Sequence, residues 1–191
     1  ITLGDQDVTG ASPDVLIANG LSYVPEERMR DGMVRDFSVA ENLILRDHFQ
    51  RPYSRAGFFD FAAIQRRANE LVSAFNVKTP SLETPAKNLS GGNIQKLILA
   101  RELSRRPRVV VAAQPTRGLD IGAIEYVHKT LLAQREQGVA ILLISEDLDE
   151  ILSLSDRIAV IYEGHIMGEV TREEATAEGL GLMMAGIARE S

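Results

Sequence analysis

A serine and two adjacent glycines stand directly before a helical pattern, and this arrangement limits the possible folds more than any other part of the chain. In the run Leu89-Ser90-Gly91-Gly92-Asn93-Ile94-Gln95-Lys96, Ser90 suits a helix N-cap and the glycines leave the first turn without side chains. The apolar residues that follow fall mostly on one face of the expected helix; they are Ile94, Leu97, Ile98 and Leu103. The pattern predicts a helix that packs by one side and begins with a bare backbone.

A helix start of this kind suits a phosphate group. The first N–H groups of a helix have no partner within it, and the helix dipole places partial positive charge at the same end. The alternative is an ordinary serine-capped helix with a flexible approach, and the motif alone is compatible with both.

Composition and charge exclude several classes of protein. Hydrophobic residues make up 45% of the 191 residues, which favours one folded domain, or one domain and a small lobe, over disorder. The net charge of −6 argues against a nucleic-acid-binding surface. The chain has no cysteine for disulfides or thiolate metal sites, and its apolar runs are too short to span a bilayer. Because it begins with Ile1 rather than methionine, we interpret it as part of a longer protein.

Short apolar runs alternate with helical patterns along the chain. The expected strands cover residues 1–3, 21–25, 109–112, 139–145, 157–162 and 165–170. The expected helices cover residues 13–18, 39–46, 61–75, 91–105, 121–136 and 147–154. Ser38 and Glu41 form a capping box, Asp60 and Asp120 suit the N-caps of the helices that follow them, and a last helix is expected after a capping box at 171–174. This alternation indicates a parallel α/β fold that ends in a hairpin, with the strands at 109–112 and 139–145 buried in the sheet.

A second motif follows the helix that begins at Ser90. The apolar run 109–111 leads into Ala113-Gln114-Pro115-Thr116-Arg117-Gly118-Leu119-Asp120, about twenty residues downstream. Together the two motifs resemble the signature sequence and the Walker B strand with its D-loop in the ATPases of ATP-binding cassette (ABC) transporters. The resemblance covers nearly the whole chain. It implies a parallel-sheet core of the P-loop NTPase type at about 1–36 and 106–191. An inserted helical subdomain at about 37–105 would dock on a membrane subunit.

In such ATPases, ATP and Mg²⁺ are bound between two cassettes. The resemblance implies that the signature residues of this chain meet the γ-phosphate of ATP held by the other cassette; these are Ser90, Gly91, Gly92 and Asn93. Asp120 would bridge the two halves. Glu26 would lie in the coupling loop that touches the membrane subunit, at a position where the family normally has glutamine. The alternative for this charged run, residues 26–32, is a solvated connector.

Residues that would act on the chain's own nucleotide depart from the family pattern. The Walker B strand should end in Asp-Glu, but Ala113 cannot ligate Mg²⁺ and Gln114 cannot accept a proton. Glu146 stands where the family has its switch histidine. The P-loop, G-x-x-x-x-G-K-[ST], is absent, and we expect it upstream of the opening strand. We assign no metal ligand. The acids at 146–150 are compatible with a metal site, but a helical first turn stabilised by the dipole explains them better.

Two interpretations of these departures are open. The chain is either a decayed cassette without function or the degenerate half of an asymmetric pair that donates its signature to the partner. The second is favoured, because the losses affect only residues that act on the chain's own nucleotide. Asn93 and the run VPEERMRDG at 24–32 also resemble the second cassette of simple-sugar importers, and the run 113–115 resembles their nucleoside branch.

The resemblance therefore implies a subunit that hydrolyses ATP to power import of a simple sugar or nucleoside. We expect it at the cytoplasmic face of the membrane, with a second cassette and transmembrane permease subunits as partners, ATP and Mg²⁺ as ligands, and no nucleic acid. This chain alone should bind ATP poorly and be inactive. The alternatives are a non-transport cassette ATPase acting on the ribosome or DNA, and a purely regulatory ATP-binding module.

Overall fold

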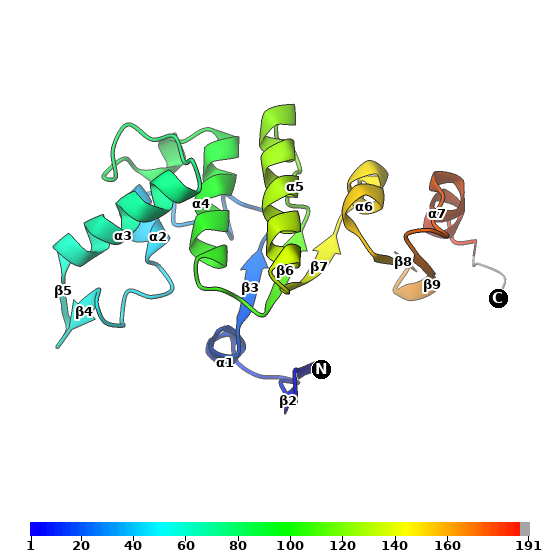
Figure 1. The fold of residues 1–191 in the computed structure, drawn as a ribbon, viewed down its shortest axis with the longest axis horizontal. Coiled ribbons are helices and arrows are strands. Elements are labelled where there is room, and N and C mark those ends of the chain that lie inside the picture. The colour runs from blue at the N-terminus through cyan, green and yellow to red at the C-terminus, as the bar shows by residue number, and fades with distance from the viewer. Residues whose placement is uncertain (188–191) are drawn as a thin grey trace. The chain divides into compact units, whose positions relative to one another are not determined.

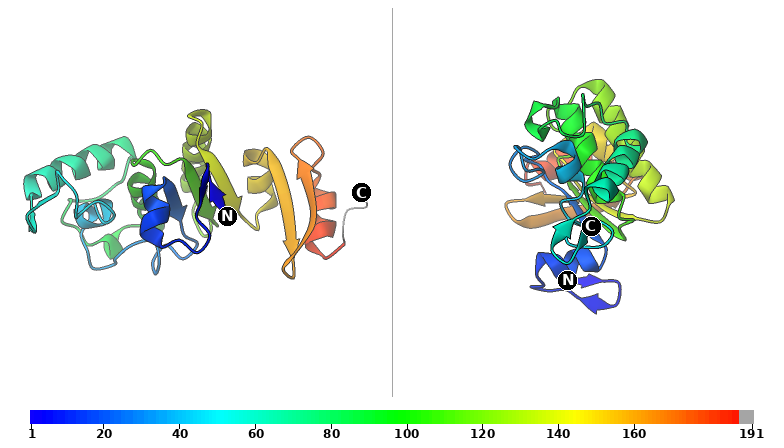
Figure 2. Two further views of the ribbon diagram at one scale, coloured as in Figure 1. Left: turned by 90° about the horizontal axis from the view of Figure 1, so that it is seen from below. Right: turned by 90° about the vertical axis from the view of Figure 1, so that its left-hand side faces the viewer.

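The computed structural model describes residues 1–187, in which strands and helices alternate (Figures 1 and 2). The strands are β1 Thr2–Leu3, β2 Gln6–Asp7, β3 Leu21–Val24, β4 Ser54–Arg55, β5 Phe58–Phe59, β6 Val109–Ala113, β7 Ala140–Ile144, β8 Arg157–Tyr162 and β9 His165–Thr171. The helices are α1 Pro13–Ala18, α2 Val39–Leu43, α3 Phe61–Ala74, α4 Gly91–Leu103, α5 Ile121–Glu136, α6 Leu148–Leu154 and α7 Ala177–Met184. The chain forms two compact units, and the second begins at Leu143. Across residues 1–187, every helix is too short or too polar to cross a bilayer.

A three-stranded sheet in the order β3–β6–β7 lies mostly in the first unit, and its strand β7 crosses the boundary at Leu143. β3 and β6 run parallel, with Leu21 opposite Val109 and Val24 opposite Ala112, as the predicted α/β class requires. The prediction that β7 is buried is wrong, because Leu142 is 55% and Ile144 49% exposed.

Helix α4 lies at the centre of the first unit. It packs against α2, α3, α5 and β3, so its side chains meet neighbours around nearly the whole circumference. The sequence predicted a single apolar face, but Gln95, Arg101 and Glu102 are buried along with the apolar residues. Only the first turn reaches the surface, where Ser90 and Gly91 are exposed.

The predicted helix starts hold at most positions. Ser38 and Glu41 form the predicted capping box, in which the Ser38 hydroxyl accepts from the Glu41 N–H at 3.2 Å. The prediction at Thr171 is wrong. The Glu174 carboxylate does accept from the Thr171 N–H, but β9 continues through Thr171, so the pair closes a turn. The helix begins later, at Ala177, where the Thr176 hydroxyl accepts from the Gly179 N–H.

Asp60 provides a test of these caps, since its carboxylate accepts from the Ala63 N–H at 2.9 Å at the start of α3. We expect Asp60→Ala to lower the free energy of unfolding by about 1 kcal/mol, because a donor of the first turn loses its partner. Asp60→Asn keeps an acceptor and should lose less. Denaturant unfolding measures both variants, and equal stability of Asp60→Ala and the parent would contradict the assignment.

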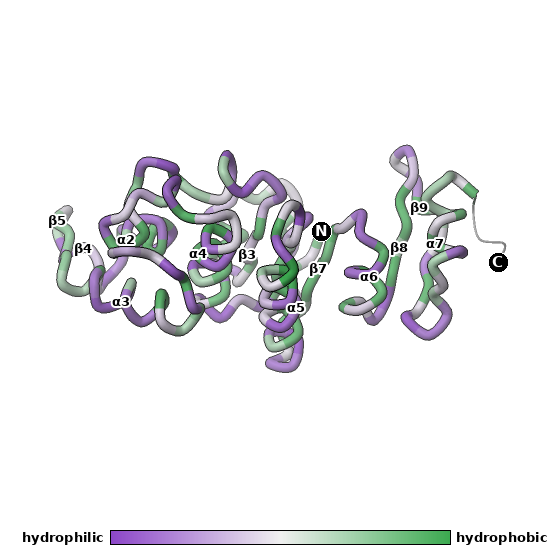
Figure 3. Tube along the Cα trace, turned by 90° about the horizontal axis from the view of Figure 1, so that it is seen from above, coloured by the Kyte–Doolittle hydropathy of each residue, from purple (hydrophilic) through white to green (hydrophobic). Residues whose placement is uncertain are grey.

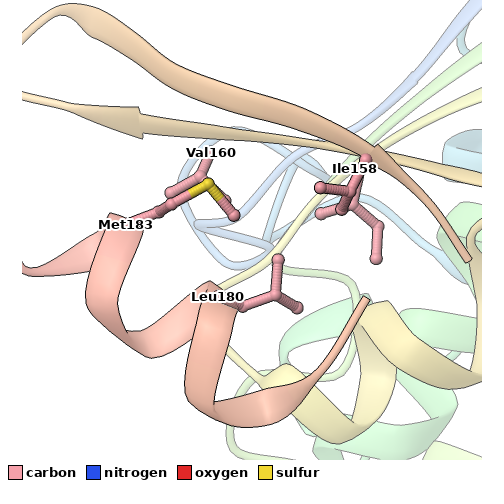
Figure 4. Packing of buried hydrophobic residues seen from close by; sticks show 5 residues of the cluster. Ile158, Val160, Leu180 and Met183 are labelled. Atoms are coloured by element: carbon pink, nitrogen blue, oxygen red, sulfur yellow. The ribbon is translucent and has the colours of Figure 1, made fainter. Parts of the chain in front are cut away.

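The second unit has its own small core. β8 and β9 form the antiparallel hairpin that the sequence predicted, with Ile158 opposite Val170. The helix α7 places Leu180 and Met183 against β8, and Figure 4 shows these side chains directed toward Ile158 and Val160.

Candidate phosphate-binding site at the start of helix α4

The start of α4 is open to an incoming anion. Ser90 occupies the predicted N-cap position with extended backbone angles (φ −67°, ψ 156°). Its side chain forms no capping hydrogen bond with the first turn of the helix, so this part of the prediction is wrong. Instead the Ser90 hydroxyl accepts a hydrogen bond of 2.9 Å from the Asn93 amide, whose oxygen accepts from the Lys78 N–H at 2.8 Å. No described side chain caps the first N–H groups of α4, and the Ser90 hydroxyl keeps its proton free to donate outward.

The two glycines allow neighbouring side chains to approach the tip of α4. A Cβ atom on Gly92 would lie 3.1 Å from the Ala123 Cβ and 3.9 Å from an Asp120 carboxylate oxygen. Asp120 caps α5 by accepting from the Ala123 N–H at 2.9 Å. The structure therefore brings the signature residues and Asp120 together, with the starts of α4 and α5 side by side. Two adjacent helix N-termini reinforce the positive potential at this surface.

Arg28 is the residue at this site that the sequence did not reveal. Its guanidinium would lie 3.5 Å from a Cβ on Gly91 and 3.9 Å from a Cβ on Gly118, so it occupies space that both glycines leave free. No residue from 1 to 187 forms a hydrogen bond or ion pair with this guanidinium. Burial lowers the pKa of Arg28, while the neighbouring Glu27 acts in the opposite direction. Arg28 belongs to the charged run 26–32, which is compatible with a solvated connector. The distance between Arg28 and Gly91 along the sequence gives no indication that the two residues lie in contact.

Glu26 connects the loop after β3 with the turn after β6. Its carboxylate forms an ion pair with Arg117, so the predicted coupling loop and the D-loop segment lie in contact. The turn begins at Gln114, which has a positive φ of 45°, and closes where the Arg117 N–H donates to the Gln114 carbonyl at 3.1 Å.

The end of β6 does not fit a magnesium ion. Ala113, its last residue, offers no ligand atom, and Gln114 offers an amide in place of a carboxylate. Oxygen ligands with negative charge are what Mg²⁺ uses in nucleotide sites. We therefore derive no catalytic step through a metal held by this chain.

Glu146 lies in the second unit and is exposed. It precedes Asp147, whose carboxylate accepts from the N–H groups of Asp149 and Glu150 at the start of α6. Asp147 is thus a helix cap, as the helical explanation of these acids requires. Within residues 1–187, no cluster of three or more histidine, cysteine or acidic side chains is placed to hold a metal ion.

Comparison with known proteins identifies relatives of the chain. It matches no family model. It is 45% identical over 186 residues to the guanosine import ATP-binding protein NupO of Bacillus subtilis, covering 97% of this chain and 36% of that protein. It is 46% identical over 186 residues to the nucleoside import ATP-binding protein NupA of Lactococcus lactis, covering 97% and 37%. It is also 46% identical over 188 residues to the glucose import ATP-binding protein TsgD13 of Haloferax volcanii, covering 97% and 34%. The chain spans about a third of the length of these relatives.

Solved structures show the same fold. A dimeric structure of the ATP-binding cassette MJ0796 in a post-hydrolysis state with ADP and Pi matches with a TM-score of 0.65 and 20% identity, covering 88% of this chain and 68% of that chain. A second dimeric structure of MJ0796, described as a bacterial ABC transporter cassette, matches with a TM-score of 0.67 and 20% identity over the same shares of the two chains. The predicted fold class is confirmed: the chain has the α/β fold of ATP-binding cassettes, with a parallel sheet.

Proposed function

We propose that this chain, which has the fold of an ATP-binding cassette, is the second cassette of an ATP-binding subunit that powers import of a nucleoside or simple sugar. Its P-loop would lie upstream, and its helical subdomain would cover about residues 37–105. The similarity to import ATP-binding proteins supports the transport role. The observation that carries the proposal is the exposed, uncapped and positively polarised start of α4.

The tip of α4 would bind the γ-phosphate of ATP held by a second cassette. ATP supplies the phosphoryl group, and this chain supplies hydrogen-bond donors: the Ser90 hydroxyl and the first N–H groups of α4. Hydrogen bonds to a charged group each contribute about 1.5–3 kcal/mol. Asn93 would hold the serine in place through their hydrogen bond of 2.9 Å, and Asp120 would fix the adjacent start of α5 at the interface between cassettes.

The chain's own nucleotide site would be the degenerate one. Ala113, Gln114 and Glu146 stand where the family pattern has the metal-binding aspartate, the catalytic glutamate and the switch histidine. Mg²⁺ would be held by the partner cassette, which would also provide the general base. Glu26 would set the coupling loop against the permease, with its Arg117 partner transmitting a change at the permease to the D-loop segment.

Purification from membranes tests this proposal. The full protein should copurify with transmembrane permease subunits at the cytoplasmic face, and it should hydrolyse ATP only when both cassettes are present. Copurification with ribosomes or DNA would contradict the import role. ATP binding without any turnover, in the presence of the permease, would instead identify a regulatory module.

Gln114 provides a prediction specific to the degenerate site. We expect Gln114→Ala to leave the ATP turnover of the full protein unchanged, because the metal-binding carboxylate beside it is already replaced by Ala113. A coupled phosphate-release assay measures the turnover. The matched change is alanine at the catalytic glutamate of the other cassette, which should reduce turnover about 10²–10⁴-fold. A large loss in Gln114→Ala would place hydrolysis at this chain's own site.

A further inference from the structure

The β4–β5 hairpin and its flanks expose an aromatic cluster far from the candidate phosphate-binding site. Four of the chain's six phenylalanines gather here, and each is at least about half exposed. They are Phe49 (67% exposed), Phe58 (80%), Phe59 (49%) and Phe61 (71%). Exposed phenylalanines that cluster in this way differ from the scattered apolar residues of an ordinary surface, and such clusters mark interaction sites.

The aromatic rings lie on both sides of the hairpin: Phe49, Phe59 and Phe61 are linked by contacts with one another or with His48, while Phe58, next to Phe59 on β5, points to the other side. The His48 ring meets Phe49 and Phe59 edge-on at centroid distances of 5.5 and 6.4 Å, and Phe59 meets Phe61 at 6.3 Å. The hairpin turns at Ala56 and Gly57, which both have positive φ, as a tight two-residue turn requires. The hairpin lies next to the start of α3 (Figures 1 and 2). Figure 3 shows hydrophobic residues in β5.

Two exposed arginines lie in or just before the hairpin, although the net charge of the whole chain is negative. Arg55 lies directly across the hairpin from Phe58, and Arg51 precedes the hairpin. Both arginines are exposed, and neither forms a hydrogen bond or ion pair through its side chain within residues 1–187. The nearby acid Asp60 is engaged as the cap of α3. This aromatic–arginine patch, defined as Phe49, Phe58, Phe59 and Phe61 with Arg51 and Arg55, is therefore apolar and locally cationic.

We propose that the aromatic–arginine patch binds the surface of a bilayer that contains anionic phospholipid. Exposed aromatic side chains enter the boundary between headgroups and acyl chains, while arginines attract the lipid phosphates and reach them through long apolar stems.

Vesicle sedimentation tests this proposal without reference to ATP, so its failure would leave the proposed transport role untouched. The purified protein is mixed with vesicles of phosphatidylcholine alone, or of phosphatidylcholine with phosphatidylglycerol. We expect binding to the anionic vesicles that weakens as salt increases. Phe58→Ser with Phe61→Ser should reduce the partition coefficient about tenfold or more, and Arg51→Gln with Arg55→Gln about tenfold.

Matched controls come from exposed residues of the second unit. Ile166, 61% exposed on β9, and Arg172 offer the changes Ile166→Ser and Arg172→Gln, which should leave vesicle binding unchanged. Circular dichroism confirms that each variant is folded. Absence of binding to either vesicle, or equal binding by patch and control variants, would overturn the proposal. So would patch variants that keep vesicle binding but lose copurification with a membrane protein, since the patch would then be a protein interface.

Discussion

Replacing Ser90 by arginine should abolish ATP turnover in the full protein, with a loss of about 10²–10³-fold, as for the removal of a donor that stabilises charge in a transition state. Ser90 is exposed at the tip of α4, and its hydroxyl would face the γ-phosphate. An arginine there would fill the space that the proposed second cassette has to enter. It also sets a second guanidinium close to Arg28, on a helix end that is already positively polarised. The loss should appear in steady-state ATP hydrolysis measured with the full protein.

Two further variants separate the loss of the Ser90 hydroxyl from the effect of the added arginine. Ser90→Ala removes only the hydroxyl, so it should reduce turnover by about tenfold to a hundredfold, the equivalent of one charged hydrogen bond. Ser73→Arg introduces the same side chain at an exposed serine of α3 in the same unit and should have no effect. Unfolding temperatures close to that of the parent should accompany all three changes. If Ser90→Arg keeps normal turnover, the α4 tip has no part in hydrolysis.

The local rules of helix starts and strand composition predicted most of the fold. Asp60 and Asp120 cap helices as expected, because a carboxylate can accept a hydrogen bond from an N–H group three residues later whatever the tertiary surroundings. Thr171 shows the limit of such rules. The same carboxylate-to-N–H contact forms there, but cross-strand pairing keeps the residue in β9 and moves the helix start to Thr176.

The candidate site was predicted as far as it lies within contiguous motifs. The glycines at 91 and 92 and the aspartate at 120 were identified from their order along the chain, and the fold brings them together. Arg28 was not identified, because its position depends on a contact between segments far apart in the sequence. The aromatic–arginine patch was not identified either, since exposure of a phenylalanine is a property of the folded surface.

The buried charges of α4 were the largest omission. A periodicity argument assigns Arg101 and Glu102 to a solvated face, yet Glu102 is fully buried and Arg101 only 6% exposed. One Glu102 carboxylate oxygen lies 2.8 Å from the Arg101 Nε and 2.9 Å from the Arg46 Nε. Burial lowers the pKa of Arg46, an effect that the carboxylate of Glu102 opposes. The three side chains therefore form a buried ionic triad, which no apolar pattern can reveal.

The triad joins α4 to the loop that carries Glu26 and Arg28. Arg101 donates to the Gly32 carbonyl at 2.8 Å, and the Ser22 hydroxyl donates to the Glu102 carbonyl at 2.9 Å. These bonds connect the buried end of α4 with β3 and with the end of the predicted coupling loop. Because α4 is one rigid helix, a displacement at its buried end would also shift the exposed tip at Ser90.

Glu102→Ala should therefore destabilise the protein by about 3–5 kcal/mol, the range for leaving one member of a buried ion pair without its partner. That is a large share of the roughly 5–15 kcal/mol that stabilises a typical folded domain. In a protein of this size, the midpoint temperature of thermal unfolding should fall by about 2–4 °C for each kcal/mol of stability lost. Glu102→Gln keeps the shape of the side chain and an acceptor, so it should lose less stability. Glu70→Ala, at an exposed glutamate of α3, should lose almost no stability.

A loss of stability below about 1 kcal/mol in Glu102→Ala would show that water or a rearranged carbonyl replaces the carboxylate. In that case the triad would not hold α4 in place, and the position of its tip would have to depend on apolar packing alone.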